Sequence, residues 1–276
     1  IAVYIGLMAS AKADPVTCPL GLGTTPTGWS LSGAGGGVDA TLSPWNPGGA
    51  VAGATTCVIV TDTGSGFPGS ISTGVSITGS GISGTTNGSI MTSPAFTALP
   101  GQTLNFNFMF FTNDGSSFSD WGRASLVNPT TGATLDLFTA RTSSNSQVVP
   151  GFGFPSFPPE LSLSPGVATL QGDTFFIPMF GNTQYGPGRY GGGPGGSSDW
   201  NHALFTFDAA TAGDWQLAMT VANVGDQIYS SGLAFSGASI GGQVVVPPPT
   251  NVPEPPALVL FALGLATLLL LRRKHV

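Results

Sequence analysis

The stretch Leu104–Phe110, Leu-Asn-Phe-Asn-Phe-Met-Phe, decides the fold class of this chain. Its large apolar residues occupy every second position and are separated by Asn105, Asn107 and Met109. Successive side chains of a strand point to opposite faces of the sheet. The alternation therefore predicts a β-strand with one buried face and one solvated face.

Segments on either side of this stretch extend the same pattern. Short β-branched, aromatic or alternating runs occur at residues 57–61, 203–207, 215–221 and 233–235. Turn-forming clusters such as Asn113–Gly115 and Pro129–Gly132 separate the runs, and before the C-terminal tail no segment keeps a period of 3.6 residues. Many short strands with Gly-rich turns predict an all-β domain, an antiparallel β-sandwich or jelly roll, over residues 14–242.

Composition and charge narrow the classes of function. Only 7% of the residues are charged, whereas the chain has 42 Gly, 23 Pro and 18 Phe. Between Asp14 and Val252 there are twelve carboxylates and three arginines, which gives this region a formal charge of −9. Such a region repels polyanions, so nucleic acid is excluded as a partner.

The N-terminal residues resemble a processing segment. Residues 1–13 are apolar and end in Ala11-Lys12-Ala13, with the small residues at the spacing of a signal-peptidase site. We interpret them as a truncated signal peptide, and an N-terminal membrane anchor is the alternative. The two cysteines, Cys18 and Cys57, are an even number in an exported chain and predict one disulfide. Two unpaired, buried cysteines are the alternative.

The C-terminal residues predict a membrane anchor. Ala257–Leu271 contains no charge and no proline and would cover roughly 22 Å as a helix, less than the bilayer core of about 30 Å. Arg272, Arg273 and Lys274 follow it and would stay in the cytoplasm. We expect a single transmembrane helix after a Pro-rich spacer at residues 243–251. A buried core helix is the alternative, although it would normally show a polar face.

Residues 252–276 resemble the PEP-CTERM sorting tail of bacterial surface proteins. The resemblance lies in the order of Val252-Pro253-Glu254-Pro255, the apolar run and the basic end. It implies recognition of this signal by an exosortase, removal or exchange of the tail, and association with exopolysaccharide and biofilm. Further along the chain, Gly213–Phe235 is similar to the closing hairpin of jelly-roll domains in such exported proteins, whose architecture resembles that of carbohydrate-binding modules.

Two stretches of the chain resemble each other. Ser119-Asp120-Trp121 is echoed by Ser198-Asp199-Trp200, and an apolar segment follows each. One interpretation is structural: a turn aspartate that satisfies backbone N–H groups, and a tryptophan that covers the edge of the sandwich. The other is a pair of loops that present a carboxylate and an aromatic ring to a glycan.

Calcium is the one cofactor that the sequence suggests, because hard cations prefer oxygen ligands. Asp114, Asp120, Asp199 and Asp226 are expected in turns, where capping of backbone N–H groups is the simpler role.

We do not expect an enzyme. The one Gly-x-Ser-x-Gly sequence, around Ser239, precedes a Pro-rich spacer instead of the helix that a nucleophile elbow requires. The sequence therefore predicts an exported, exosortase-sorted protein of the cell surface or matrix, with a calcium-dependent carbohydrate-binding module as the alternative.

Overall fold

The chain divides into two units, Ile1–Val246 and Pro247–Val276. The computed structural model describes residues 18–39, 55–61, 75–76, 81–112, 119–141, 147–149, 157–164, 168–169, 171–172, 177–179, 183–185, 196–198, 200–227, 231–241 and 243–244, all of which belong to the first unit. The predicted signal peptide and sorting tail lie outside these ranges. So does the predicted spacer, residues 243–251, except for Gln243 and Val244, which form a short strand. Within them, no helix is long and apolar enough to cross a membrane.

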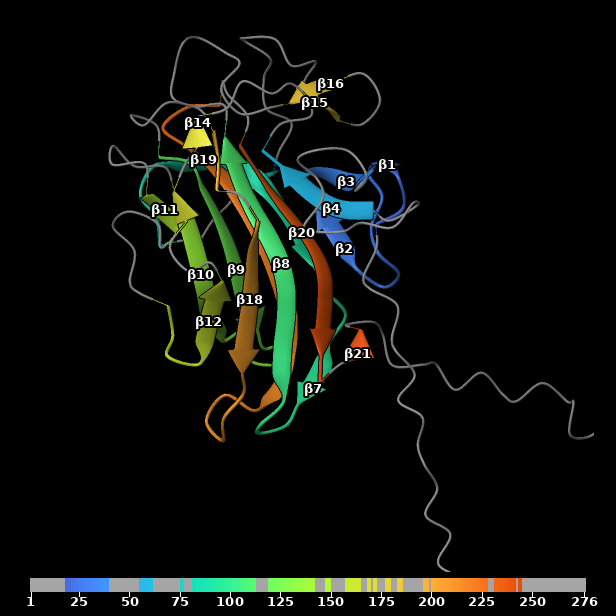
Figure 1. Cartoon of the computed structure of the whole chain (residues 1–276), viewed down its shortest axis with the longest axis vertical. Coiled ribbons are helices and arrows are strands. Elements are labelled where there is room, and N and C mark those ends of the chain that lie inside the picture. Colours follow the sequence, from blue (N-terminus) through green and yellow to red (C-terminus); the bar gives the residue numbers. More distant parts are fainter. Residues whose placement is uncertain are drawn as a thin grey trace, which may run out of the picture. The chain divides into compact units, whose positions relative to one another are not determined.

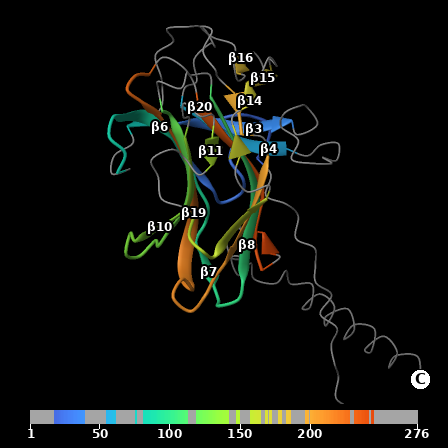
Figure 2. The ribbon, with the colours of Figure 1, turned by 60° about the vertical axis from the view of Figure 1, so that its left-hand side comes forward.

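The described residues are all-β and form two large antiparallel sheets, as the sequence predicts at the level of fold class. Figure 2 shows the sheets as two layers, with β6, β10 and β19 in one and β4 and β8 in the other. The jelly-roll connectivity within this class stays a prediction.

The larger sheet, here called sheet A, has ten strands, and Figure 1 shows β18, β8 and β20 side by side at its centre. Its strands, given in chain order, are β1 (Gly21–Leu22), β3 (Ala34–Asp39), β4 (Thr55–Val60), β8 (Thr103–Thr112), β12 (Leu161–Ser164), β14 (Gln171–Gly172), β17 (Gly196–Ser197), β18 (Asn201–Thr206), β20 (Ser231–Ile240) and β21 (Gln243–Val244).

Sheet B has seven strands, with the order β10-β9-β19-β6-β2 and with β5 and β7 paired to β6 and β19. Its strands are β2 (Ser30–Ser32), β5 (Val75–Ser76), β6 (Thr85–Thr92), β7 (Phe96–Ala98), β9 (Trp121–Val127), β10 (Thr134–Arg141) and β19 (Gly213–Val224). Two separate pairs complete the list: β11 (Gln147–Val149) with β13 (Ala168–Thr169), and β15 (Ile177–Met179) with β16 (Thr183–Tyr185).

The predicted strand at residues 104–110 lies within β8 and supplies the centre of the core. Leu104, Phe106, Phe108 and Phe110 are completely buried in one cluster with residues of sheet B. Phe108 stacks on Phe138 of β10, with 3.8 Å between the ring centroids. Burial of each such ring contributes about 1.5–3 kcal/mol, so this one strand anchors both layers.

The opposite face of β8 is only partly solvated. Asn105 and Asn107 are half-buried, as expected, but Met109 is 1% exposed. It joins a second apolar cluster, with Phe111 and with Val58 and Val60 of β4, on the face of sheet A that points away from the core. The prediction that Met109 faces solvent is therefore wrong, because alternation identifies the two faces of a strand but not what covers each face.

A glycine lies at the point where the chain passes from sheet B to sheet A. Gly33 separates β2 from β3 and has a φ of 99°, which side-chain-bearing residues rarely adopt. A Cβ atom at this position would lie 2.3 Å from the hydroxyl oxygen of Ser89. That hydroxyl donates to the carbonyl oxygen of Val60 and accepts from the N–H of Ala34, so the crossing is fixed to both sheets.

Candidate functional site

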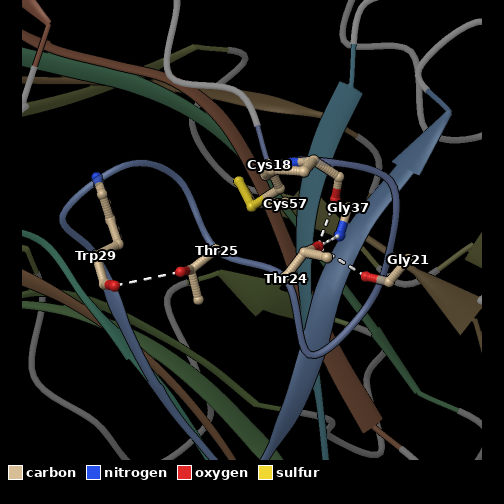
Figure 3. Close-up of a disulfide and its surroundings, with 8 residues drawn as sticks. Cys18, Gly21, Thr24, Thr25, Trp29, Gly37 and Cys57 are labelled. Carbon is tan, nitrogen blue, oxygen red and sulfur yellow. Dashed lines mark hydrogen bonds between the residues drawn. A yellow bond between two sulfur atoms is a disulfide. The ribbon is translucent and has the colours of Figure 1, made fainter.

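The predicted disulfide is present between Cys18 and Cys57, with a Cα–Cα distance of 5.2 Å (Figure 3). Both residues are completely buried. The bond attaches the chain before β1 to β4. Beside it, Thr24 donates to the carbonyl oxygen of Gly21 at 2.7 Å and accepts from the N–H of Gly37 at 3.0 Å. A Cβ atom on Gly37 would lie 2.1 Å from the Pro19 carbonyl oxygen, so the N-terminal segment can approach β3 only at a glycine.

Asp120 is a buried carboxylate that joins the two sheets. It precedes β9 of sheet B and is 1% exposed. Its Oδ1 accepts from the N–H of Val224 at 2.8 Å. Its Oδ2 accepts from the hydroxyl of Ser231, at the start of β20 in sheet A, at 2.6 Å. Hydrogen bonds to a charged acceptor are stronger than neutral ones, so this residue fixes one end of the sandwich.

The hydrogen bonds around Asp120 continue through four further polar side chains. The Ser231 hydroxyl lies 2.7 Å from the Thr112 hydroxyl, and the Ser231 N–H donates to Thr61 Oγ1 at 3.0 Å. The side-chain amide of Asn87, on β6, donates to the Thr61 carbonyl oxygen at 2.9 Å. We call these five residues, Thr61, Asn87, Thr112, Asp120 and Ser231, the inter-sheet network.

Arg141, at the end of β10, carries a positive charge that interacts with Asp120. Its Nε donates to the Ser119 carbonyl oxygen at 3.0 Å. Burial lowers the pKa of the Arg141 guanidinium, and the charge of Asp120 opposes that shift. An arginine stays protonated despite such a shift, so the pair places a positive charge beside a buried negative one.

Trp121 is also buried, in a cluster separate from the main core. It is 1% exposed and contacts Ala222 in a small apolar cluster with Ile82, Ile90 and Val224. Its indole N–H donates to Thr85 Oγ1 at 3.2 Å, and the Arg123 guanidinium lies 5.0 Å from the centre of its ring. Asp120 and Trp121 are therefore both buried, and the glycan-binding role of this Ser-Asp-Trp stretch stays a prediction.

The second Ser-Asp-Trp stretch occupies a different environment. The register of pairing with β8 shifts by one residue between Ser197 of β17 and Asn201 of β18, which is a β-bulge. At the bulge, the hydroxyl of Ser198 accepts from the N–H of Phe110 at 2.9 Å. Trp200 is half-buried against the outer cluster of sheet A, whereas Asp199 lies outside the described residues. The two echoed tryptophans therefore belong to different sheets.

The calcium prediction has no described ligand set. Asp114 and Asp199 lie outside the described residues, and the carboxylate of Asp120 is engaged by protein donors. Asp226 is half-buried, and its main-chain carbonyl accepts from the Thr86 hydroxyl at 2.7 Å. In the part of the chain that the structure describes, no group of three or more His, Cys, Asp or Glu residues could hold a metal ion.

The Gly-x-Ser-x-Gly sequence does not form a nucleophile elbow. Ser239 lies within β20, where it pairs with Asn105 of β8 and with Val244 of β21. A nucleophile elbow is a strained turn between a strand and a helix, so this serine lacks the required backbone.

The outer face of sheet B carries a cluster of polar side chains that the sequence analysis did not predict. Arg123 of β9 lies 3.3 Å from the carboxylate of Asp136 on β10 and donates to Thr139 Oγ1 at 3.2 Å. The hydroxyl of Ser125 donates to Asp136 at 2.8 Å. Alternation along β9 places Arg123 and Ser125 on one face, but the partners on β10 depend on a register shift between Asp136 and Phe138, and no local sequence signal marks that shift.

Comparison with known proteins yields one family match. Residues 251–274 match the PEP-CTERM protein-sorting motif. No curated protein matches the chain. A solved structure of the xylan-binding domain from CBM 22, formally the x6b domain, is similar over 73% of this chain and 90% of that chain, with 14% sequence identity and a TM-score of 0.20. A similarity this weak carries no argument.

The family match covers the segment that the sequence analysis identified as a sorting tail. It includes the Pro253-Glu254-Pro255 signal, the apolar run and the basic residues through Lys274. The motif implies that the protein is exported and processed by an exosortase at the membrane. The chain thus carries a PEP-CTERM protein-sorting motif at residues 251–274, after a β-rich region that is consistent with a β-sandwich ectodomain.

Proposed function

We propose that this protein is a non-enzymatic structural component of the bacterial cell surface or extracellular matrix, associated with exopolysaccharide. The observation that carries the proposal is the sorting motif at residues 251–274, which follows a disulfide-linked β-sandwich. An even number of cysteines joined in a buried bond suits an oxidising compartment outside the cytoplasm.

The polar residues of the sandwich interior support a structural role. Asp120 accepts hydrogen bonds from both sheets, and the Ser231 N–H donates to Thr61. Buried polar groups are costly unless they are paired, and here the pairs fix the fold. A hydrolase would instead hold a carboxylate or a nucleophile in an accessible position.

The processing enzyme and the membrane topology in this proposal are inferred from the tail. In this proposal, Val252, Pro253, Glu254 and Pro255 are the residues that the exosortase recognises. Ala257–Leu271 is held in the inner membrane, and Arg272, Arg273 and Lys274 remain in the cytoplasm until the tail is removed. The ectodomain is then released to the cell surface or the matrix.

Surface delivery tests the proposal. The chain is produced in an exosortase-bearing bacterium, and its exposure on intact cells is measured by labelling with a membrane-impermeant reagent. Wild type should be labelled, and Glu254→Ala should reduce the labelled fraction at least severalfold. Glu160→Ala is the matched control, because it removes the only other glutamate and leaves the motif intact. Equal labelling of all three proteins would overturn the sorting role.

A further inference from the structure

The outer face of sheet B presents two complete rows of residues across five strands. Cross-strand partners define each row, from β2 through β6, β19 and β9 to β10. The first row is Ser30, Thr92, Ala218, Ser125 and Asp136. The second row is Ser32, Ile90, Thr220, Arg123 and Thr139. We call these ten positions the hydroxyl face, because six of them are Ser or Thr.

The direction of this face follows from the residues between its two rows. Met91 of β6, Met219 of β19 and Ala124 of β9 are completely buried in the core. Neighbouring positions on a strand point to opposite faces, so both rows point away from the core. At the open edge of the face Ser30 and Ser32 are exposed, and at the other edge the side chain of Asp136 is 47% exposed.

The centre of the hydroxyl face offers hydroxyl groups that no described residue engages. Thr92 and Thr220 are half-buried, and in the described part of the chain their hydroxyls make no hydrogen bond to protein. The hydroxyls of the inter-sheet network are, in contrast, all bonded. Each free hydroxyl can donate one hydrogen bond and accept others.

The charge of the hydroxyl face limits the class of molecule that could bind to it. Arg123 and Asp136 form an ion pair, so the ten positions are electrically balanced. They belong to a region with twelve carboxylates and three arginines, which repels anionic polymers. A second copy of this chain would bring the same negative charge, and Ile90 and Ala218 alone give too little apolar area for a stable dimer.

We propose that the hydroxyl face binds a neutral polysaccharide chain. Five strands spaced by about 4.8 Å make each row about 19 Å long, and the rows are about 7 Å apart along the strands. An extended, uncharged chain of sugars fits a surface of this shape, because its hydroxyls both donate and accept hydrogen bonds. Ile90, which is half-buried, offers a contact to the C–H groups of the rings, whereas Ala218 is buried. The proposal rests on the association with exopolysaccharide in the proposed function, and its test uses purified protein, so its failure can be distinguished from a failure of sorting.

Affinity electrophoresis tests the proposal on the full chain, kept soluble in a detergent without a sugar headgroup. The neutral probes are hydroxyethyl cellulose, xyloglucan, glucomannan and dextran, and alginate is the anionic comparison. At least one neutral polymer should retard the protein, and alginate should not. No retardation by any neutral polymer, or equal retardation by alginate, would overturn the proposal.

Variants locate the binding on the molecule. The double variant Thr92→Val/Thr220→Val removes two hydroxyls and keeps β-branched side chains, so it should fold and lose about tenfold in affinity. Thr206→Val is the matched control, because Thr206 is exposed on β18 of the other sheet. Full affinity in the double variant would place any binding elsewhere and overturn this site. If the double variant does not fold, Ser30→Ala/Ser32→Ala at the exposed edge replaces it, with an expected loss of about threefold.

Discussion

The inter-sheet network and the hydroxyl face are built from the same kinds of residue and differ in what those residues contact. Both contain Ser, Thr and Asp. In the network, Asp120 and Ser231 are 1% and 0% exposed, and they bond each other across the two sheets. On the face, Thr92 and Thr220 are half-buried and unbonded within the described chain. Burial and partners, and not residue type, distinguish a group that holds the fold from one that is available to a ligand.

Of the changes to buried residues, loss of the disulfide should cause the largest decrease in the free energy of unfolding. The bond closes a loop with a sequence separation of 39 residues, for which the chain-entropy model gives about 4 kcal/mol. Cys18→Ser/Cys57→Ser should therefore lower the free energy of unfolding by about that amount, as measured by urea denaturation. Reduction of the wild type under denaturing conditions, followed by refolding with the thiols blocked, should give the same midpoint. An unchanged midpoint in both proteins would show that the bond adds no stability.

Removal of the Asp120 carboxylate should have the next largest effect. Asp120→Ala leaves the Val224 N–H without its acceptor and leaves the buried Ser231 hydroxyl with Thr112 as its remaining described partner, which should cost about 3 kcal/mol. Asp214→Ala is the control, because Asp214 is exposed and its carboxylate accepts a hydrogen bond from the Thr97 hydroxyl at the surface. The control should change stability by less than about 1 kcal/mol. Similar losses in both variants would contradict the distinction between interior and surface.

The alternation of residues 104–110 was sufficient to predict β8 and the inward direction of Phe106 and Phe108. The cysteine count was sufficient to predict the disulfide. The burial of Asp120 was not predictable, because its partners lie 104 and 111 residues further along the chain. Turn composition around Asp120 indicated a loop, and only the pairing of β9 with β19 places that loop inside the sandwich.

The hydroxyl face could not be predicted from the sequence, for a related reason. Its rows depend on the register of five strands, and the register of β10 shifts between Asp136 and Phe138. The bulge leaves Leu137 and Phe138 both buried in the core. A regular alternation through this strand would have assigned one of these residues to the solvent face.

Substitution of the buried residue Asn201 should raise the stability of the fold, in contrast to the two preceding substitutions. It is completely buried at the start of β18, and both polar atoms of its side chain lack a hydrogen-bond partner among the described residues. An unpaired buried amide is costly, so Asn201→Leu should raise the free energy of unfolding by about 1–3 kcal/mol. The measurement is the shift in urea midpoint at constant slope. A loss of stability would mean that the amide is satisfied in solution by a group such as bound water.

The smallest expected effect concerns a surface turn. The Thr211 hydroxyl and the N–H groups of Ala210 and Thr211 donate to the Asp208 carboxylate. Hydrogen bonding, first of all from the Thr211 side chain, lowers the pKa of Asp208 below 3.8. A lowered pKa stabilises the folded state above the unfolded pKa, and this stabilisation is lost as the pH falls through the folded value. Thr211→Val should raise the Asp208 pKa in an NMR titration and leave the hydroxyl face unchanged.

The intact mass of the protein recovered from exosortase-bearing cells and from cells without the exosortase tests the central claim most directly. We predict a product that lacks the tail after the Pro253-Glu254-Pro255 signal in the first cells and retains it in the second. The Cys18–Cys57 bond should be intact in both. A product that keeps residues 257–276 in exosortase-bearing cells would contradict the claim and would mean that the chain remains anchored in the membrane.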